Sequence, residues 1–230
     1  MKTIFFDFDG TLTQESANIW KSIWRKLGYD IGSDSYYRAL YKSFMEEKIT
    51  HQQWCDLTCE AFIKKGMNKE MLDELASGIK FIDGAREVFE ILKKQGFEIF
   101  ILSGNIVEVI EQVLGDNTKY LDAIMANIFV FDEKGNLQKI AGTSYDFEGK
   151  AKFIKEYKEK TFSNADDLYF VGNGGNDEWA HLSGCHTICI NPDGTDANDS
   201  TKWHEVIEKV DDLRQILPAL DINEIYDENE

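Results

Sequence analysis

The chain has 230 residues, of which 43 % are hydrophobic and 13 % aromatic, so it can bury a substantial core and is not a disordered chain. Its 42 acidic and 25 basic residues give a net charge of −17, which opposes binding to nucleic acid or to an anionic membrane. No apolar run approaches the roughly 20 residues of a membrane span. The first residues lead directly into a strand pattern without the features of a signal peptide. We therefore expect no nucleic-acid partner and no membrane association.

The four cysteines form two sequence pairs. Cys55 and Cys59 lie on a helical pattern, whereas Cys185 and Cys189 lie in or beside a strand pattern. Neither pair has the two-residue spacing of common zinc sites. We interpret them as reduced, structural thiols, which is typical of a cytoplasmic protein.

The first predicted element is a strand that ends in two carboxylates. Ile4, Phe5 and Phe6 lead into Asp7 and Asp9, and a glycine then ends the run, a pattern typical of a strand buried in a parallel sheet. Residues two apart on a strand point to the same side, and open α/β sheets bind ligands at the carboxyl ends of their strands. Two carboxylates there would suit Mg²⁺. Taken alone, the same residues also suit a turn with solvated carboxylates.

Helical periodicity then replaces the strand pattern. Apolar stripes predict helices over residues 19–27, 37–45, 50–62 and 68–75. Thr50 and Gln53 have the form of a capping box before the third of these helices. We predict a helical cap domain over residues 14–80.

From residue 81 onward helices and strands alternate. Strands are predicted at 97–102, 123–131, 137–140, 168–171 and 187–190, with a hairpin turn at 132–136. Helices are predicted at 85–95, 105–114, 149–160, from about 176, at 202–209 and at 211–217, before an acidic tail over 221–230. The alternation predicts an α/β fold: a doubly wound, Rossmann-like parallel sheet with a four-helix cap inserted after the first strand. The core domain would comprise residues 1–13 and 81–230.

Three later segments could complete a site with Asp7 and Asp9. Ser103-Gly104-Asn105 follows the second core strand, where it could hold a phosphate at a helix N-terminus or simply cap the helix. Gly149-Lys150-Ala151 opens a later helix, and Lys150 could neutralise a phosphate or be an ordinary surface lysine. The glycine-rich segment 171–178 follows the fourth core strand and contains Asn173 and Asp177.

In this order, the four segments resemble the motifs of the haloacid-dehalogenase-like (HAD) superfamily, most of whose members are phosphatases. The resemblance implies that Asp7 attacks phosphorus and that Asp9 is the general acid and base. It also implies that Ser103 and Gly104, with Thr11, bind the phosphate and that Lys150, or failing that Lys152, neutralises it. The metal ligands implied are Asp7, Asp9, Asn173 and Asp177, and the implied cofactor is Mg²⁺.

One position departs from the family pattern. Asn173 stands where relatives usually carry an aspartate that ligates Mg²⁺, and an amide oxygen brings no charge. We expect weaker Mg²⁺ binding or a larger share of the work on Asp177. The departure also leaves open a catalytically weakened phosphate-binding or regulatory protein. A dehalogenase is disfavoured because its chemistry needs neither Asp9 nor a metal.

The helical insert and the segments around residues 83–86 and 101–104 resemble the phosphoserine-phosphatase-like branch. Members of that branch bind the amino-acid part of phosphoserine with an acid after the first motif and an arginine in the cap. The counterparts here would be Glu15, one residue short of the family spacing, and Arg38, with Arg25 as the alternative. The resemblance thus implies a Mg²⁺-dependent phosphatase of a small phosphorylated metabolite, acting through an aspartyl-phosphate.

Overall fold

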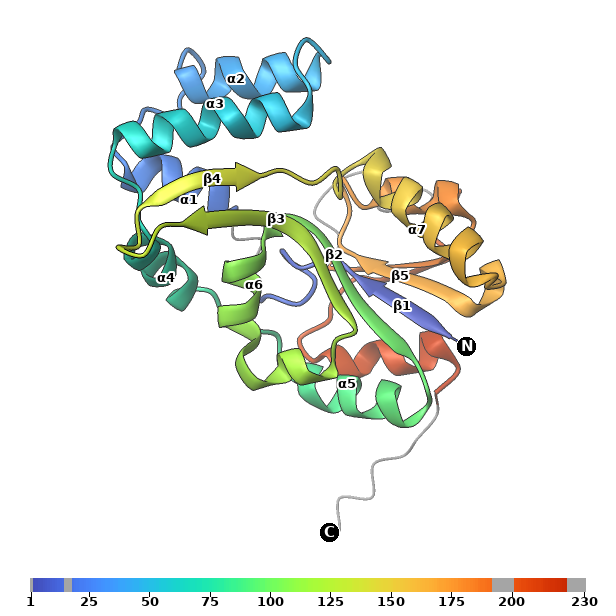
Figure 1. Ribbon diagram of the computed structural model, residues 1–230. Coiled ribbons are helices and arrows are strands. Elements are labelled where there is room, and N and C mark those ends of the chain that lie inside the picture. Colours follow the sequence, from blue (N-terminus) through green and yellow to red (C-terminus); the bar gives the residue numbers. More distant parts are fainter. Residues whose placement is uncertain (1, 15–17, 192–200, 223–230) are drawn as a thin grey trace.

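A computed structural model describes residues 2–14, 18–191 and 201–222 of the chain. Its centre is a seven-stranded sheet with the order β4-β3-β2-β1-β5-β6-β7 (Figure 1). All neighbouring strands run parallel except β3 and β4, which are antiparallel. The strands are β1 Thr3–Phe6, β2 Glu98–Ile106, β3 Ala123–Phe131, β4 Leu137–Ala141, β5 Leu168–Gly172, β6 His186–Ile190 and β7 Glu205–Ile207.

Strand β1 lies in the middle of the sheet because its residues are apolar on both faces. Every residue of Thr3–Phe6 is buried, and Phe5 lies opposite Phe100 of β2 and Phe170 of β5. Since side chains alternate along a strand, Ile4 and Phe6 join one hydrophobic cluster and Phe5 joins another. The predicted parallel sheet, buried on both faces, is confirmed.

Helices cover the two faces separately (Figure 1). The face of Ile4 and Phe6 packs against α5 (Ala85–Lys94), α6 (Val107–Leu114) and the 3-10 helix η5 (Leu213–Leu220). The opposite face packs against α7 (Glu148–Thr161) and the 3-10 helix η3 (Glu178–Ser183). This arrangement is the doubly wound fold expected from the alternation of elements.

The predicted four-helix insert is present, with its two chain connections side by side. It consists of α1 Ile19–Lys26, α2 Tyr36–Met45, α3 His51–Lys64 and α4 Lys69–Ser77. The capping box of Thr50 and Gln53 forms at the start of α3 as predicted. Thr13 and Phe81 form an antiparallel bridge, and the amide of Ile82 donates to the carbonyl of Leu12 at 2.9 Å. The insert therefore leaves and rejoins the core at one point.

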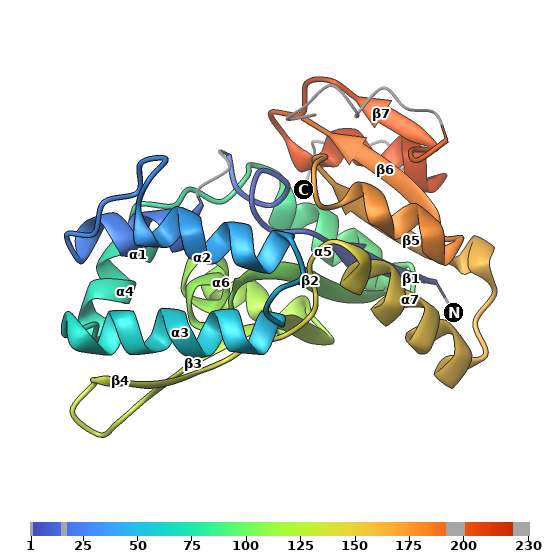
Figure 2. The same ribbon diagram turned by 90° about the horizontal axis from the view of Figure 1, so that it is seen from above.

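The insert lies beside the β3–β4 hairpin (Figure 2) and shares its hydrophobic core with it. Ile106, Phe129, Leu137 and Ile140 join the cluster that holds the insert's buried side chains. The amide of Leu137 also donates to the carbonyl of Met67 at 3.1 Å. The cap packs on the core rather than standing apart from it. The division into a core domain (1–13 and 81–230) and a cap domain (14–80) therefore stays a proposal.

Three helix predictions differ from the structure. The helix expected at 202–209 is wrong, because residues 205–207 pair with Ile188–Ile190 as strand β7, and sheet pairing overrides a helical pattern. The helix expected at 105–114 begins only at Val107, since β2 continues through Ile106. The helix expected from about residue 176 is the short 3-10 helix η3.

Other predictions are confirmed. The turn at 132–136 joins β3 and β4 as a hairpin, and the helix expected at 211–217 is present as η5. Most of the acidic tail, residues 223–230, lies outside the described residues. Within the described part of the chain, no helix has the length and apolar character that crossing a membrane requires.

All four cysteines are buried, and none of them forms a disulfide within the described part of the chain. Burial raises the pKa of the Cys55 thiol to about 12 and that of Cys185 to about 11. Thiols with such pKa values remain protonated near neutral pH, which fits the predicted structural role.

Candidate active site

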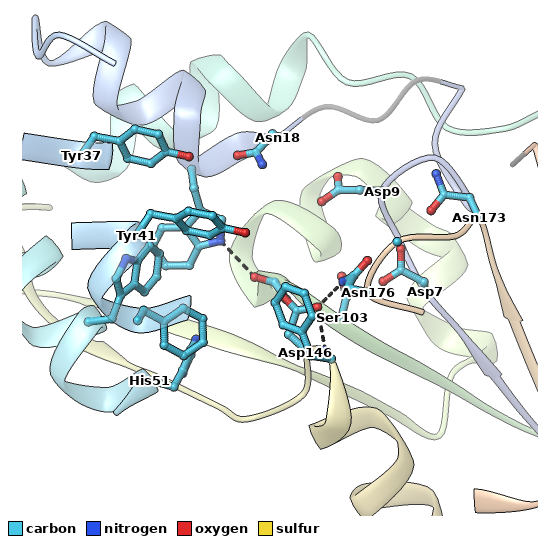
Figure 3. A pocket seen from close by; sticks show the side chains of 16 residues that line it. Asp7, Asp9, Asn18, Tyr37, Tyr41, His51, Ser103, Asp146, Asn173 and Asn176 are labelled. Carbon is cyan, nitrogen blue, oxygen red and sulfur yellow. Dashed lines mark hydrogen bonds between the residues drawn. The ribbon is translucent and has the colours of Figure 1, made fainter. Parts of the chain in front are cut away.

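A cavity of about 400 Å³ lies where the carboxyl ends of the core strands face the helical insert. Asp7, Asp9, Ser103, Gly104 and Asn173 all line it, so residues far apart in sequence meet in one place. Figure 3 shows these core residues on one side of the cavity and aromatic side chains of the insert on the other. The predicted convergence of the four sequence segments at one edge of the sheet is therefore observed.

Lys150 lies beneath the cavity and joins two carboxylates. Its Nζ donates to Oδ1 of Asp7 at 2.7 Å and also to Oδ1 of Asp177. The lysine is fully buried and Asp7 is 4 % exposed. Burial lowers the pKa of Lys150, but Asp177, Asp7 and Asp146 outweigh this effect and raise it above its usual value. Lys150 is thus a fixed cation against Asp7, whereas the alternative, Lys152, is exposed.

Asp177 lies behind Asp7 and does not line the cavity. Its Oδ1 accepts from Lys150, and its Oδ2 accepts from the backbone amide of Asn173 at 2.9 Å. A Cβ on Gly172 would approach Oδ2 of Asp177 to 2.6 Å, so glycine makes room for this carboxylate. Burial and then Asp7 raise the pKa of Asp177 to about 7, while Lys150 acts in the opposite direction. Asp177 therefore holds Lys150 and the backbone at Asn173 in place, and its carboxylate does not face the cavity in which a ligand would bind.

Asp9 is held by Asn105, a contact that the sequence did not reveal. Nδ2 of Asn105 donates to both carboxylate oxygens of Asp9, at 2.9 and 3.0 Å. Burial, followed by repulsion from Asp7, raises the pKa of Asp9 well above its usual value, and the hydrogen bonds of Asn105 lower it in part. A raised pKa favours the protonated carboxyl group, which is the form that can act as a general acid.

A β-bulge in β2 aims Ser103 and Asn105 at this edge of the sheet. The stretch from Leu102 to Ile106 lies opposite the shorter stretch from Met125 to Asn127, so β2 carries extra residues here. Asn105 was predicted to open or cap a helix, but it lies within the strand and the N-cap of α6 is Ile106. The signal available in the sequence was a run of polar residues directly after an apolar strand.

Asp146 is the second site residue that sequence reasoning missed. It lines the cavity, and its Oδ1 accepts a hydrogen bond from Nδ2 of Asn176. A Cβ on Gly104 would lie 2.7 Å from Oδ2 of Asp146, which places this carboxylate against the bulged end of β2. Burial raises the pKa of Asp146, and Lys150 opposes that shift. Nothing in the local pattern distinguished Asp146 from a solvated loop acid.

The two predicted phosphate-binding hydroxyls are both buried. Ser103 lines the cavity, and its Oγ accepts from the amide of Asn105 at 3.3 Å. The hydroxyl of Thr11 has no hydrogen-bond partner among the described residues and does not line the cavity. Both assignments stay predictions.

Arg38, the arginine expected to bind an amino-acid leaving group, does not line the cavity. Glu15 lies outside the described residues. Arg38 is exposed and lines a different hollow, of about 550 Å³, on the outer side of α2. Arg25 is exposed as well and does not line the cavity. The geometry does not bring these arginines to Asp7.

The oxygen donors that face the cavity suit a hard cation. Asp7 and Asn173 both line it, and carboxylate and amide oxygens are ligands that Mg²⁺ accepts. The described residues contain no group of three or more His, Cys, Asp or Glu side chains placed to hold a metal. Since Mg²⁺ is commonly held by one or two carboxylates together with substrate phosphate, this sparse donor set is compatible with it.

The chain belongs to the haloacid dehalogenase-like hydrolase family, whose sequence pattern matches residues 1–180. This match confirms the predicted family. Similarity to curated and solved phosphoserine phosphatases confirms the predicted branch.

Two curated relatives illustrate the similarity. A probable phosphoserine phosphatase of Schizosaccharomyces pombe is 26 % identical over 178 residues, and a phosphoserine phosphatase of Archaeoglobus fulgidus is 26 % identical over 185 residues. Each alignment covers 76 % of this chain but 56 % and 48 % of the respective relatives. The chain thus spans about half the length of these relatives.

Solved structures share the fold over almost the entire chain. A phospho-aspartyl intermediate analogue of phosphoserine phosphatase matches with a TM-score of 0.65 at 24 % identity, covering 95 % of this chain and 98 % of that one. A substrate-bound phosphoserine phosphatase complex matches with a TM-score of 0.68 at 23 % identity, covering 95 % and 97 %. These likenesses confirm the fold.

Proposed function

We propose that this chain is a phosphatase that hydrolyses a small phosphomonoester through an aspartyl-phosphate on Asp7. The observation that carries the proposal is the fixed arrangement of Asp7, Lys150 and Asp9 at the base of one cavity. The relatives named phosphoserine phosphatase support the reaction class and make phosphoserine the first ester to test.

In the first step, a carboxylate oxygen of Asp7 attacks phosphorus, and the bond to the leaving alcohol breaks. Asp9 gives its proton to the leaving oxygen, which suits a carboxyl group whose pKa is raised by burial and by Asp7. In the second step, Asp9 takes a proton from water, and the resulting hydroxide attacks phosphorus. Inorganic phosphate leaves, and the carboxylate of Asp7 is restored.

The remaining residues support this chemistry through position and charge. Lys150 fixes the Asp7 carboxylate and places a positive charge next to the phosphate site. Ser103, Gly104 and Thr11 would bind phosphate oxygens, and Asp177 would hold Lys150 in place. Asn105 would position Asp9.

Mg²⁺ is the proposed cofactor, as is general among phosphatases of this family. Asp7, Asp9 and Asn173, which line the cavity, would hold it, with the weaker binding expected from an uncharged amide. When bound, the cation would neutralise charge on the phosphate oxygens.

The test is phosphate release from a panel of phosphomonoesters, with Mg²⁺ and with a chelator, for the wild type and for Asp7→Asn. Metal-dependent release that disappears in Asp7→Asn is expected. The absence of release from every ester at saturating Mg²⁺ would instead favour the second candidate, a phosphate-binding or regulatory protein weakened by Asn173.

We also propose the cytoplasm as the location, supported by four buried cysteines that form no disulfide among the described residues. A net charge of −17 supports a small phosphorylated metabolite over nucleic acid as the partner.

A further inference from the structure

The insert contributes an almost entirely aromatic surface to the cavity. Among the described residues of the insert, every side chain that lines the cavity apart from Asn18 carries a ring: Trp20, Tyr37, Tyr41, Phe44, His51 and Trp54. Figure 3 shows Tyr37, Tyr41 and His51 on the side of the cavity away from Asp7 and Asn173. The rings therefore lie where the organic part of a phosphate ester would extend from the reacting phosphorus.

These rings are packed against one another and form a pre-organised surface. The rings of Trp20 and Trp54 lie 4.9 Å apart in an edge-to-face arrangement, and Phe44 and His51 both contact Trp54. Nε1 of Trp20 donates to the carbonyl of Gly104 at 2.9 Å, which ties the aromatic surface to the phosphate end. A rigid surface loses little conformational entropy when a ligand binds.

No cation faces this part of the cavity. Every lysine and arginine of the chain lies within the described residues, and none of them lines the cavity. Lys150 is buried below and is bonded to Asp7 and Asp177. Burial lowers the pKa of His51, which favours the neutral form of its ring.

Carboxylates do line the cavity, including Asp146 at the border between the phosphate end and the rings. A substrate carboxylate entering here would lose its hydration without gaining a cationic partner and would be repelled by Asp146. The cavity therefore disfavours an amino-acid leaving group.

We propose that the organic part of the substrate is a planar aromatic or heteroaromatic alcohol without a carboxylate, packed against the rings of the insert. This inference rests on the proposed phosphatase function and specifies its substrate class. Aromatic rings gain energy from edge-to-face and offset contacts with other rings beyond the burial of area. A cavity of about 400 Å³ is within the usual range for ligands with a ring system, and it is roomy for a small ammonium group.

The first experiment compares kcat/KM within matched pairs of esters. We expect 2-phenylethyl phosphate to exceed ethyl phosphate by about tenfold or more, because several ring contacts are gained. We expect phosphoethanolamine to exceed phosphoserine by about tenfold, since these two esters differ only by the carboxylate. A preference for phosphoserine over phosphoethanolamine would overturn the inference. A preference for phosphocholine over both 2-phenylethyl phosphate and 3,3-dimethylbutyl phosphate would also overturn the inference, because the rings would then bind a cation.

The second experiment places the preference on the aromatic surface. Tyr41→Leu removes a half-buried ring of α2 that lines the cavity, whereas Tyr36→Leu removes an exposed ring of the same helix that does not. Tyr41→Leu should lower kcat/KM for 2-phenylethyl phosphate several-fold more than for ethyl phosphate, and Tyr36→Leu should change neither. Equal losses on both esters in Tyr41→Leu would contradict the proposed contact.

A binding measurement separates this inference from the proposed reaction. Trp20 and Trp54 line the cavity, so tryptophan fluorescence of Asp7→Asn can report binding of 2-phenylethyl phosphate and of phosphoserine. Absence of hydrolysis throughout the panel would refute the phosphatase function alone. Tighter binding of 2-phenylethyl phosphate would still support the inference, and tighter binding of phosphoserine would overturn it.

Discussion

Replacement of Lys150 by methionine should destabilise the fold as well as abolish activity. The fully buried ammonium holds Asp7 at 2.7 Å and also contacts Asp177, and both carboxylates are themselves buried. Lys150→Met keeps most of the side-chain volume but leaves two neighbouring carboxylates without their cation. Breaking a buried ion pair in this way costs about 3–5 kcal/mol.

In a chain of 230 residues, about 1 kcal/mol corresponds to roughly 2–4 °C in the melting temperature. The expected loss is therefore about 6–20 °C. Urea and thermal unfolding in the presence of a chelator would measure it, since added metal could otherwise replace the missing charge. Lys152→Met is the matched control, because Lys152 is exposed and its loss should change stability by less than about 0.5 kcal/mol.

The loss of folding stability in Lys150→Met should also depend on pH. Burial and Asp7 already raise the pKa of Asp177 to about 7 in the presence of Lys150, above the ordinary value of 3.8. A carboxyl group whose pKa is raised by folding stabilises the folded state at low pH, and this contribution is lost as the pH rises through the folded pKa. Without the Lys150 cation, folding should raise the pKa of Asp177 further. The stability lost in Lys150→Met should therefore be smaller near about pH 5 than near about pH 8.

A second variant tests the assigned cause. In Lys150→Met combined with Asp177→Asn, one of the two buried charges is gone, so much of the lost stability should return. The reasoning would be refuted by a Lys150→Met protein that unfolds like the wild type, or by a double variant less stable than Lys150→Met alone.

Two further predictions concern the residues that flank the nucleophile. Asn173→Asp adds a charged oxygen donor to the cavity, so the Mg²⁺ concentration for half-maximal activity should fall by about tenfold, and an unchanged value would show that Asn173 is not a ligand. Asn105→Ala removes the two hydrogen bonds that lower the pKa of Asp9, so the alkaline limb of the kcat/KM profile should move to higher pH. An unshifted limb would mean that Asp9 is not the group that titrates in that profile.

The sequence predicted the sheet and the meeting of the four segments because both follow from short-range patterns. The buried run that ends in Asp7 could lie only in the middle of a parallel sheet, and strand ends in such a sheet share one edge. Ser103 lies near the carboxyl end of β2 and Asn173 follows β5 of the same sheet, so their convergence required no knowledge of packing.

The rest of the site depends on contacts that no local pattern records. Asn105 faces Asp9 because of a bulge between β2 and β3, and a bulge depends on the partner strand. Asp146 belongs to a loop placed by tertiary packing. The stripes of the insert predicted buried rings correctly but not which of those rings would face the cavity, since one helix can bury rings against two neighbours.

The adjoining ends of the insert also bear on how such a protein could be built from modules. With Thr13 paired to Phe81, a short linker could replace the whole insert without disturbing the central strand. Removal of the insert would nevertheless expose Phe129, Leu137 and Ile140 to solvent, and the resulting apolar patch would be prone to aggregation. The chain connections would thus allow the insert to be removed, but the apolar surface that it covers would then face water. Any exchange of caps between relatives would have to transfer the β3–β4 hairpin along with the four helices.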